Sequence, residues 1–281
     1  MAAEDDKLAK SRALTEGDLT EHALPESDLG EYHSSEIVRT IRARTPARLL
    51  AGRSGAAYRT NTQLELREAH AAARDAVRAE LNLFPADEED PVNELVKRWN
   101  LFEARTRATS KDEYLARPDF GRRLNDESLA EIKRRCAIGK DLQIVIGDGL
   151  SVTAVTEQVP RLLPLLSEGA KARGWSVGEI FVVRYCRVGI LNEIGELLDP
   201  KVAVLLIGER PGLATAESLS AYMAYRPKAS DTDANRNLIS NIHARGVAIE
   251  QAVQRILNLA ASMMTNQKSG FQLREELPTI T

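Results

Sequence analysis

The chain has 281 residues, of which 43% are apolar and 28% are charged, a composition typical of globular proteins. Its net charge of −3 argues against general nucleic-acid binding, because nucleic-acid-binding domains are usually basic. No apolar run reaches the roughly 20 residues of a membrane-spanning helix, and the N-terminus lacks the basic and apolar regions of a signal peptide. Cys136 and Cys186 form no C-x-x-C pair, so we expect neither a zinc site nor a disulfide framework. This cysteine usage favours an intracellular location.

The chain begins with a polar arm and an arginine-rich segment. Residues 1–35 are polar, acidic and poorly periodic, so we expect them to form a flexible arm. Six arginines then fall within twenty-one residues interrupted by proline and glycine: Arg39, Arg42, Arg44, Arg48, Arg53 and Arg59. Such a segment can bind phosphates or an acidic protein surface. A solvated basic face is the alternative interpretation.

The region 36–139 is predicted to be mainly helical. Capping, proline and glycine residues bound three expected helices, at about 61–84, 92–102 and 125–138. Trp99 and Phe102 lie on one face of the second helix. Apolar residues at helical spacing usually pack into a core, so we expect these two aromatic side chains to be core residues.

The hydrophobic pattern changes period after Gly139. Short apolar runs predict strands at about 142–146, 180–185, 202–207 and 221–225, and longer periodic segments predict helices at 159–172 and 247–266. The first of these helices contains Pro160 and Pro164, which restrict where it starts. Strands that alternate with helices predict an α/β fold with a mostly parallel, Rossmann-like sheet flanked by helices. We therefore expect a Rossmann-like domain over 140–281, preceded by the helical region and the arm.

Two predicted strands end in glycine-containing loops. Residues 208–212 read Gly-Glu-Arg-Pro-Gly, in which Gly208 would allow a sharp turn and Glu209 and Arg210 place charges at the strand end. Ligands of open α/β sheets bind outside the carboxyl ends of strands. Residues 147–151 read Gly-Asp-Gly-Leu-Ser, which completes neither the dinucleotide fingerprint nor a Walker A loop. Both loops are candidate ligand contacts, and an ordinary turn with a solvated ion pair is the alternative for 208–212.

No catalytic set stands out, and His243 is the histidine that most needs an interpretation. The segment Ser-Asn-Ile-His-Ala-Arg-Gly at 240–246 nearly matches D-x-H-x-x-G, through which some proteins ligate cobalt. Asn241 stands in place of the aspartate, and an amide cannot supply the anionic partner that orients a ligating imidazole. We therefore expect no metal ligand here and a histidine held in a loop by backbone hydrogen bonds. A binding subunit, or half of an enzyme whose chemistry lies on another chain, fits this sequence.

Six segments form a more specific combination. They read R-T-P-A-R-L-L-A-G-R-S-G at 44–55, R-P-D-F-G-R-R-L at 117–124, Q-I-V-I-G-D-G-L-S at 143–151, V-R-Y-C-R-V at 183–188, L-L-I-G-E-R-P-G-L at 205–213 and I-S-N-I-H at 239–243. Together they resemble the small subunits of ethanolamine ammonia-lyase, an adenosylcobalamin enzyme. The resemblance implies conversion of ethanolamine to acetaldehyde and ammonia. It also implies a large subunit that holds ethanolamine and the catalytic residues.

Within that family the small subunit covers the coenzyme, which sits between the two subunits. The resemblance places coenzyme contacts at Val188, Glu209 and Leu238. The family usually has a cysteine at the last position, so the leucine retains an apolar contact and loses a thiol. The family also binds cobalamin with its own base on cobalt, which keeps His243 off the metal.

Other functions stay open at this point. The first alternative is a stand-alone nucleotide- or cobalamin-binding module without a catalytic partner. The second is a scaffold that delivers the large subunit to a bacterial microcompartment shell. The arginine-rich segment favours a permanent protein partner, so the lyase subunit is our first interpretation. We expect neither a nucleic acid nor a membrane as a partner. We expect a cytoplasmic protein, and the inside of a microcompartment is a narrower version of that location.

Overall fold

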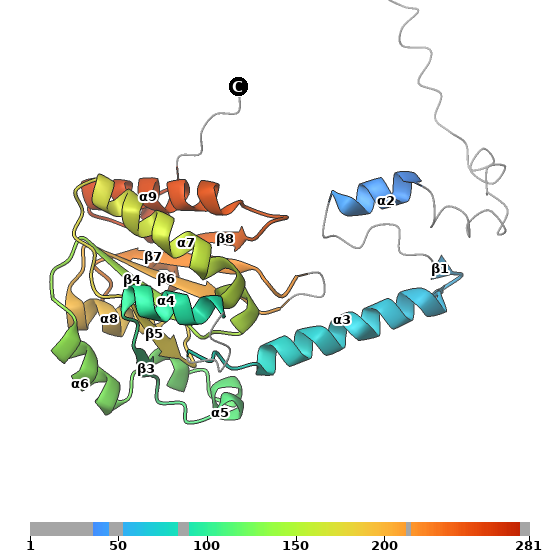
Figure 1. Cartoon of the computed structure of the whole chain (residues 1–281), viewed down its shortest axis with the longest axis horizontal. Helices are drawn as coiled ribbons and strands as arrows, with labels where there is room; N and C mark the ends of the chain where they lie inside the picture. Colours follow the sequence, from blue (N-terminus) through green and yellow to red (C-terminus); the bar gives the residue numbers. More distant parts are fainter. Residues whose placement is uncertain (1–35, 45–52, 84–89, 212–214, 276–281) are drawn as a thin grey trace, which may run out of the picture. The chain divides into compact units, whose positions relative to one another are not determined.

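A computed structural model describes residues 36–44, 53–83, 90–211 and 215–275 (Figure 1). The chain divides after Leu64 into two compact units. The N-terminal unit contains helix α2 (Glu36–Ala43) and a short antiparallel pair, β1 (Arg53–Ser54) and β2 (Ala57–Tyr58). Helix α3 (Thr60–Arg78) begins in this unit and continues into the next. The arm predicted at 1–35, and Arg48, lie outside the described residues.

The C-terminal unit is built around a six-stranded sheet of order β3-β5-β4-β6-β7-β8. The strands are β3 (Glu103–Arg105), β4 (Leu142–Gly147), β5 (Phe181–Arg184), β6 (Val202–Gly208), β7 (Leu219–Tyr225) and β8 (Asn237–Ile242). Strands β3, β5, β4 and β6 pair in parallel, whereas β7 is antiparallel to both of its neighbours. The α/β class is confirmed. The sheet is mixed, however, and a Rossmann-like topology is not confirmed.

Helices cover both faces of this sheet (Figure 1). Helices α4 (Pro91–Trp99), α7 (Val152–Ala172) and α9 (Ile249–Asn266) contribute to the core on one face, and α6 (Asp126–Arg135) and α8 (Ile190–Leu198) to the core on the other. Ile144 and Ile146 belong to the first core and Val145 to the second, because successive strand residues point to opposite faces. Every residue of β4 and β6 is buried, which confirms that these strands are covered on both sides.

The predicted helices differ from the observed ones mainly at their ends. Helix α3 ends at Arg78 rather than near residue 84. Helix α7 starts at Val152 rather than at 159, so both of its prolines lie inside the helix. Its start is fixed by Ser151, whose Oγ accepts the N–H of Ala154 at 3.3 Å. The buried face of α7 then continues through the prolines, and tertiary packing outweighs the local helix-breaking tendency.

Several short elements were not predicted. Helix α8 and strand β8 were missed, as were β3 and helix α5 (Lys111–Ala116) in the region expected to be helical. Phe102 lies beyond the end of α4, but it and Trp99 do pack against the cores as expected. Cys136 and Cys186 are buried free thiols. Among the described helices, none combines the length and apolar character needed to cross a bilayer.

Candidate functional site

The carboxyl end of β6 carries the glycine-containing loop singled out from the sequence. Glu209 is half-buried and Arg210 is exposed, and the Glu209 N–H donates to the Ser218 carbonyl at 3.3 Å. The loop leads into the antiparallel strand β7 and not into a helix. Gly208 has no left-handed backbone conformation, which corrects the expected reason for a glycine there. A Cβ at this position would collide with the Ser151 carbonyl oxygen.

Tyr222 on β7 connects Glu209 to the third predicted contact. Its hydroxyl donates to Glu209 Oε1 at 2.9 Å. Burial, and then the Glu209 charge, raise the pKa of the Tyr222 phenol well above its usual range, so the phenol stays a donor. Leu238 lies directly opposite Tyr222 in the antiparallel β7–β8 pair and is 44% exposed. Within the described residues Glu209 takes part in no ion pair, which disfavours the solvated ion pair considered for this loop.

Val188 comes from a different part of the C-terminal unit. It is half-buried in the turn between β5 and α8, and its carbonyl accepts the Leu191 N–H at 3.2 Å. The next residue, Gly189, faces the Arg122 side chain, because a Cβ there would lie 3.0 Å from Arg122 Cγ. The position of residue 188 is therefore fixed by the close approach of the segment that contains Arg122.

A cavity of about 330 Å³ lies beside these positions. Its lining comes from η1 (Phe120–Arg122), the start of α8 and the loop that enters β8, and includes Arg122, Arg123, Gly189, Asn192, Asp231, Asp233 and Arg236. Gly189 follows Val188 directly, and Arg236 precedes Leu238 by two residues. Near neighbours in sequence of Val188 and of Leu238 therefore line one cavity, which we call the Arg236 cavity.

Arg236 is the most unusual residue of the Arg236 cavity. Its side chain is 5% exposed, and Nη2 donates to Asn192 Oδ1 at 2.7 Å while Nη1 pairs with Asp233. Burial lowers the pKa of Arg236, although Asp233 and Asp231 oppose this effect. Its buried Nε has no hydrogen-bond partner among the described residues. Buried donors without partners are rare and call for an explanation.

A larger cavity of about 910 Å³ lies at the carboxyl ends of β4, β5 and β6. Four arginines line it, from the second half of α3 and from the two strand-end loops: Arg67, Arg74, Arg187 and Arg210. Arg187 and Arg210 are sequence neighbours of Val188 and Glu209. Two of the positions expected to contact a ligand are therefore adjacent in sequence to this arginine-lined cavity.

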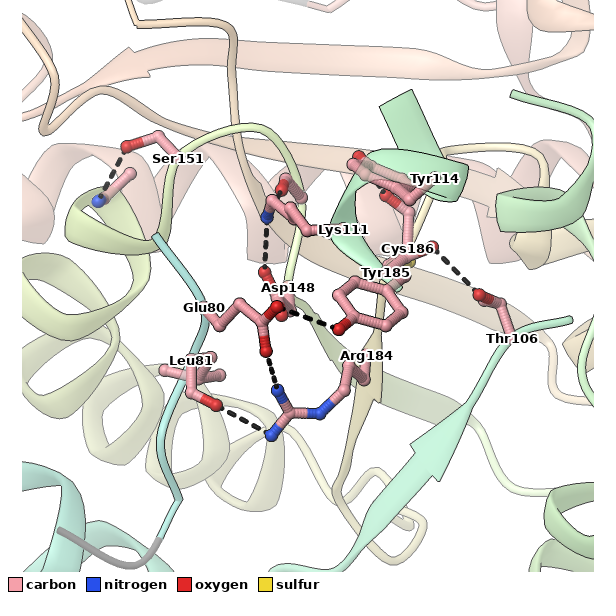
Figure 2. Close-up of polar contacts among 12 residues, drawn as sticks. Glu80, Leu81, Thr106, Lys111, Tyr114, Asp148, Ser151, Arg184, Tyr185 and Cys186 are labelled. Carbon is pink, nitrogen blue, oxygen red and sulfur yellow. Dashed lines mark hydrogen bonds and ion pairs between the residues drawn. The ribbon is translucent and has the colours of Figure 1, made fainter. Parts of the chain in front are cut away.

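The Gly-Asp-Gly-Leu-Ser loop makes several hydrogen bonds within the chain (Figure 2). The Asp148 N–H donates to Val183 and the Leu150 N–H to Gly208 within the sheet, so these groups are occupied. The Asp148 carboxylate is fully buried and pairs with Lys111 Nζ at 3.3 Å. Lys111 also donates to the Gly149 carbonyl at 3.0 Å. Nothing in the sequence pointed to Lys111, which lies 37 residues away on α5.

A second ion-pair network adjoins this loop (Figure 2). Arg184 Nη2 pairs with Glu103 at 2.7 Å, and Arg184 Nη1 pairs with Glu80 at 3.3 Å. The Tyr185 hydroxyl donates to Glu80 at 3.0 Å, and Arg184 also donates to the Leu81 carbonyl. These bonds fasten the segment after α3 to the ends of β3 and β5. Both carboxylates of this network are paired with Arg184, so we assign the network a structural role.

His243 lies in a tight turn after β8. It is 2% exposed, its Nδ1 accepts the Arg245 N–H at 3.3 Å, and a Cβ on Gly246 would lie 2.8 Å from its Nε2. This is the loop-holding histidine expected from the sequence. No cluster of three or more metal-ligating side chains occurs in the described ranges.

Comparison with known proteins gives a consistent result. The family "Ethanolamine ammonia-lyase light chain (EutC)" matches residues 35–274. The ethanolamine ammonia-lyase small subunit of Clostridium perfringens is 42% identical over 239 residues, which cover 85% of this chain and 78% of that protein. The small subunit of Clostridium acetobutylicum is 39% identical over 254 residues, with 90% and 99% covered. That of Fusobacterium nucleatum is 38% identical over 258 residues, with 92% and 84% covered.

Proposed function

Because the chain belongs to the ethanolamine ammonia-lyase small-subunit family, and so is one subunit of a heteromeric ammonia-lyase, we propose that it supplies one side of an adenosylcobalamin site. The observation that carries this proposal is the Glu209–Tyr222–Leu238 arrangement, together with the Arg236 cavity lined by Gly189, the residue that follows Val188. It offers an apolar side chain, a carboxylate and buried donors on one surface. The large subunit is proposed to close the other side of the site and to hold ethanolamine.

The residues present fit a corrin ring better than a nucleotide. An exposed leucine and a half-buried valine can contact an extended apolar face, whereas two N–H groups of the Asp148 loop are already used within the chain. Arg236 Nε is a buried donor that still needs an acceptor. His243 is enclosed in its turn, so we propose that the coenzyme keeps its own base on cobalt.

When bound, adenosylcobalamin supplies a carbon radical by cobalt–carbon homolysis, which starts the conversion of ethanolamine to acetaldehyde and ammonia. The part proposed for this chain is to bind and orient the coenzyme and to exclude water from it, since cofactors carry the chemistry while proteins position them. Val188 and Leu238 would contact the apolar face. Glu209, held by the Tyr222 hydroxyl, would accept hydrogen bonds from coenzyme amides or ribose hydroxyls.

The partner is proposed to lie against the arginine-rich segment and the arginine-lined cavity. Arginine pairs with carboxylates through two parallel hydrogen bonds and is frequent at interface hot spots. Arg53 in the N-terminal unit lies over the Tyr58 ring at 4.9 Å, which holds one of these guanidiniums in place. An acidic surface on the large subunit would complement these groups.

We expect the purified chain alone to release no ammonia from ethanolamine, because its residues provide no group for radical chemistry. Co-expression with the large subunit should yield a complex whose ammonia release requires adenosylcobalamin. The measurement is coenzyme-dependent ammonia production by each subunit and by the complex. Turnover by the chain alone would contradict the proposal. A chain that binds cobalamin but never associates with the large subunit would support the stand-alone binding module instead.

Glu209→Gln should raise the coenzyme Kd of the complex about tenfold, since a hydrogen bond to a charged group contributes roughly 1.5–3 kcal/mol. The amide can still accept the Tyr222 hydroxyl, so chain stability should change little. Glu250→Gln on α9 is the matched control, because this carboxylate is exposed and its ion pair within the described residues is with the exposed Arg161. Equilibrium binding of adenosylcobalamin to the complex measures the effect. An unchanged Kd would remove Glu209 from the site.

A further inference from the structure

The Arg236 cavity contains a buried guanidinium, that of Arg236, to which the three predicted coenzyme contacts give no role. The guanidinium of Arg236 is held from two directions, by Asn192 on α8 and by Asp233 on η2 (Asp233–Asn235). Asn192 is itself fixed, because its Nδ2 donates to the Asp231 carbonyl at 2.8 Å. The two terminal nitrogens are therefore engaged, while the Nε–H is buried without a partner in the described structure. A rigid donor in a cavity is suited to one specific acceptor.

The lining of the cavity indicates the class of that acceptor. Three arginines and two aspartates share the surface, so cationic donors and anionic acceptors stand side by side. Asp233 already offsets the charge of Arg236, and Arg123 lies 3.6 Å from Glu193. A phosphate would meet these carboxylates as well as the arginines. A primary amide carries an acceptor oxygen and two N–H donors, and it can satisfy both kinds of group without bringing net charge.

We propose that Arg236, positioned by Asn192, binds the carbonyl oxygen of a primary amide on a side arm of the corrin ring. The inference rests on the proposed function and adds a fourth coenzyme contact to Val188, Glu209 and Leu238. The geometry supports it because the cavity is lined by Gly189, which directly follows Val188, and by Arg236, which precedes Leu238 by two residues. A ring held over these two positions would direct a side arm into the space between them.

The test measures cyanocobalamin affinity of the complex of this chain with its large subunit, by equilibrium dialysis and absorbance, so that turnover plays no part. Arg236→Met should raise the Kd roughly ten- to hundredfold, from the loss of a hydrogen bond to a charged group. Arg236→Lys keeps a cation near Asp233 and lacks the Nε–H, so a smaller loss is expected. Arg161→Met on α7 removes an exposed arginine from the opposite face and should change nothing.

To find which side-arm amide contacts Arg236, the Kd is measured for a set of cobalamin monocarboxylates. In each of these, one side-arm amide is replaced by a carboxylate. The wild-type complex should bind one member of this set more weakly than cyanocobalamin, because its carboxylate would meet Asp231 and Asp233, and Arg236→Met should lose that discrimination. A loss of affinity equal for cobalamin and for every monocarboxylate would overturn the amide assignment. An unchanged Kd in a correctly assembled Arg236→Met complex would overturn the contact itself.

Two further outcomes have definite meanings. If Arg236→Met prevents assembly, Arg236→Lys decides the question, because an assembled lysine variant with wild-type affinity would contradict the proposal. If the wild-type complex binds no cyanocobalamin at all, the proposed function fails, and it fails separately from the assignment of Arg236.

Discussion

Lys111→Met should lower the free energy of unfolding by about 3–5 kcal/mol, because removing one partner of a buried ion pair leaves the other charge uncompensated. Asp148 is fully buried and Lys111 is 7% exposed at the side chain, so water cannot replace the lost partner. The second carboxylate oxygen of Asp148 already lacks a partner among the described residues. Equilibrium denaturation of the purified chain, followed by circular dichroism, measures the loss.

Two variants test the cause of that loss. Lys111→Met combined with Asp148→Asn should recover most of the stability, because a neutral amide replaces the stranded charge. Arg117→Met removes an exposed arginine that pairs with Asp119, and exposed pairs contribute about 1 kcal/mol or less. If Lys111→Met were no worse than Arg117→Met, the buried pair would not stabilise the fold.

The same variant has a predictable dependence on pH. Burial raises the pKa of Asp148, and Lys111 is the strongest opposing influence, so its removal raises that pKa further. A carboxyl whose pKa is raised by folding contributes stability below its unfolded pKa, and this is lost as pH rises through the folded pKa. The stability deficit of Lys111→Met relative to wild type should therefore shrink as the pH is lowered from neutral into the acid range. A deficit that grows toward acid would contradict this explanation.

The sequence was most informative where burial is two-sided. Strands β4 and β6 read as continuous apolar runs because helices cover both faces. Helix α8 was missed because it is short and contains Gly195, a helix-weakening residue. In the structure a Cβ at Gly195 would collide with the Pro227 carbonyl, so packing requires the glycine. Strand β8 was missed because it lies at the sheet edge and several of its residues are exposed.

The candidate site was only partly predictable for a related reason. Glu209 could be located because it follows an obvious strand. Tyr222 could not be assigned, since its role depends on the β7–β8 register that places it opposite Leu238. Arg236 meets Asn192 across 44 residues of sequence, and no local pattern encodes that contact. Long-range partners of this kind are what the structure adds to the resemblance.

Gly208→Ala should cost about 3 kcal/mol of stability, at the upper end of what overpacking usually costs. The added Cβ would collide with the Ser151 carbonyl oxygen, which is backbone and cannot rotate away, and would crowd the Ala154 side chain at 3.1 Å. Relief requires β6 to separate from the loop that caps α7, where the Leu150 N–H donates to Gly208. Because Glu209 is the next residue, the same displacement should weaken cobalamin binding by the complex.

Gly174 is the matched control because its backbone conformation, and not crowding by neighbouring atoms, favours a glycine there. Its φ is +74° and a Cβ there meets nothing within 4 Å, so Gly174→Ala should cost only about 1 kcal/mol, the usual penalty of a left-handed alanine. Asparagine tolerates that conformation, so Gly174→Asn should be nearly neutral while Gly208→Asn should be worse than Gly208→Ala. Thermal and denaturant unfolding of the four variants give the comparison. Equal losses at both positions would mean that the approach of the Ser151 carbonyl is not what requires the glycine that precedes Glu209.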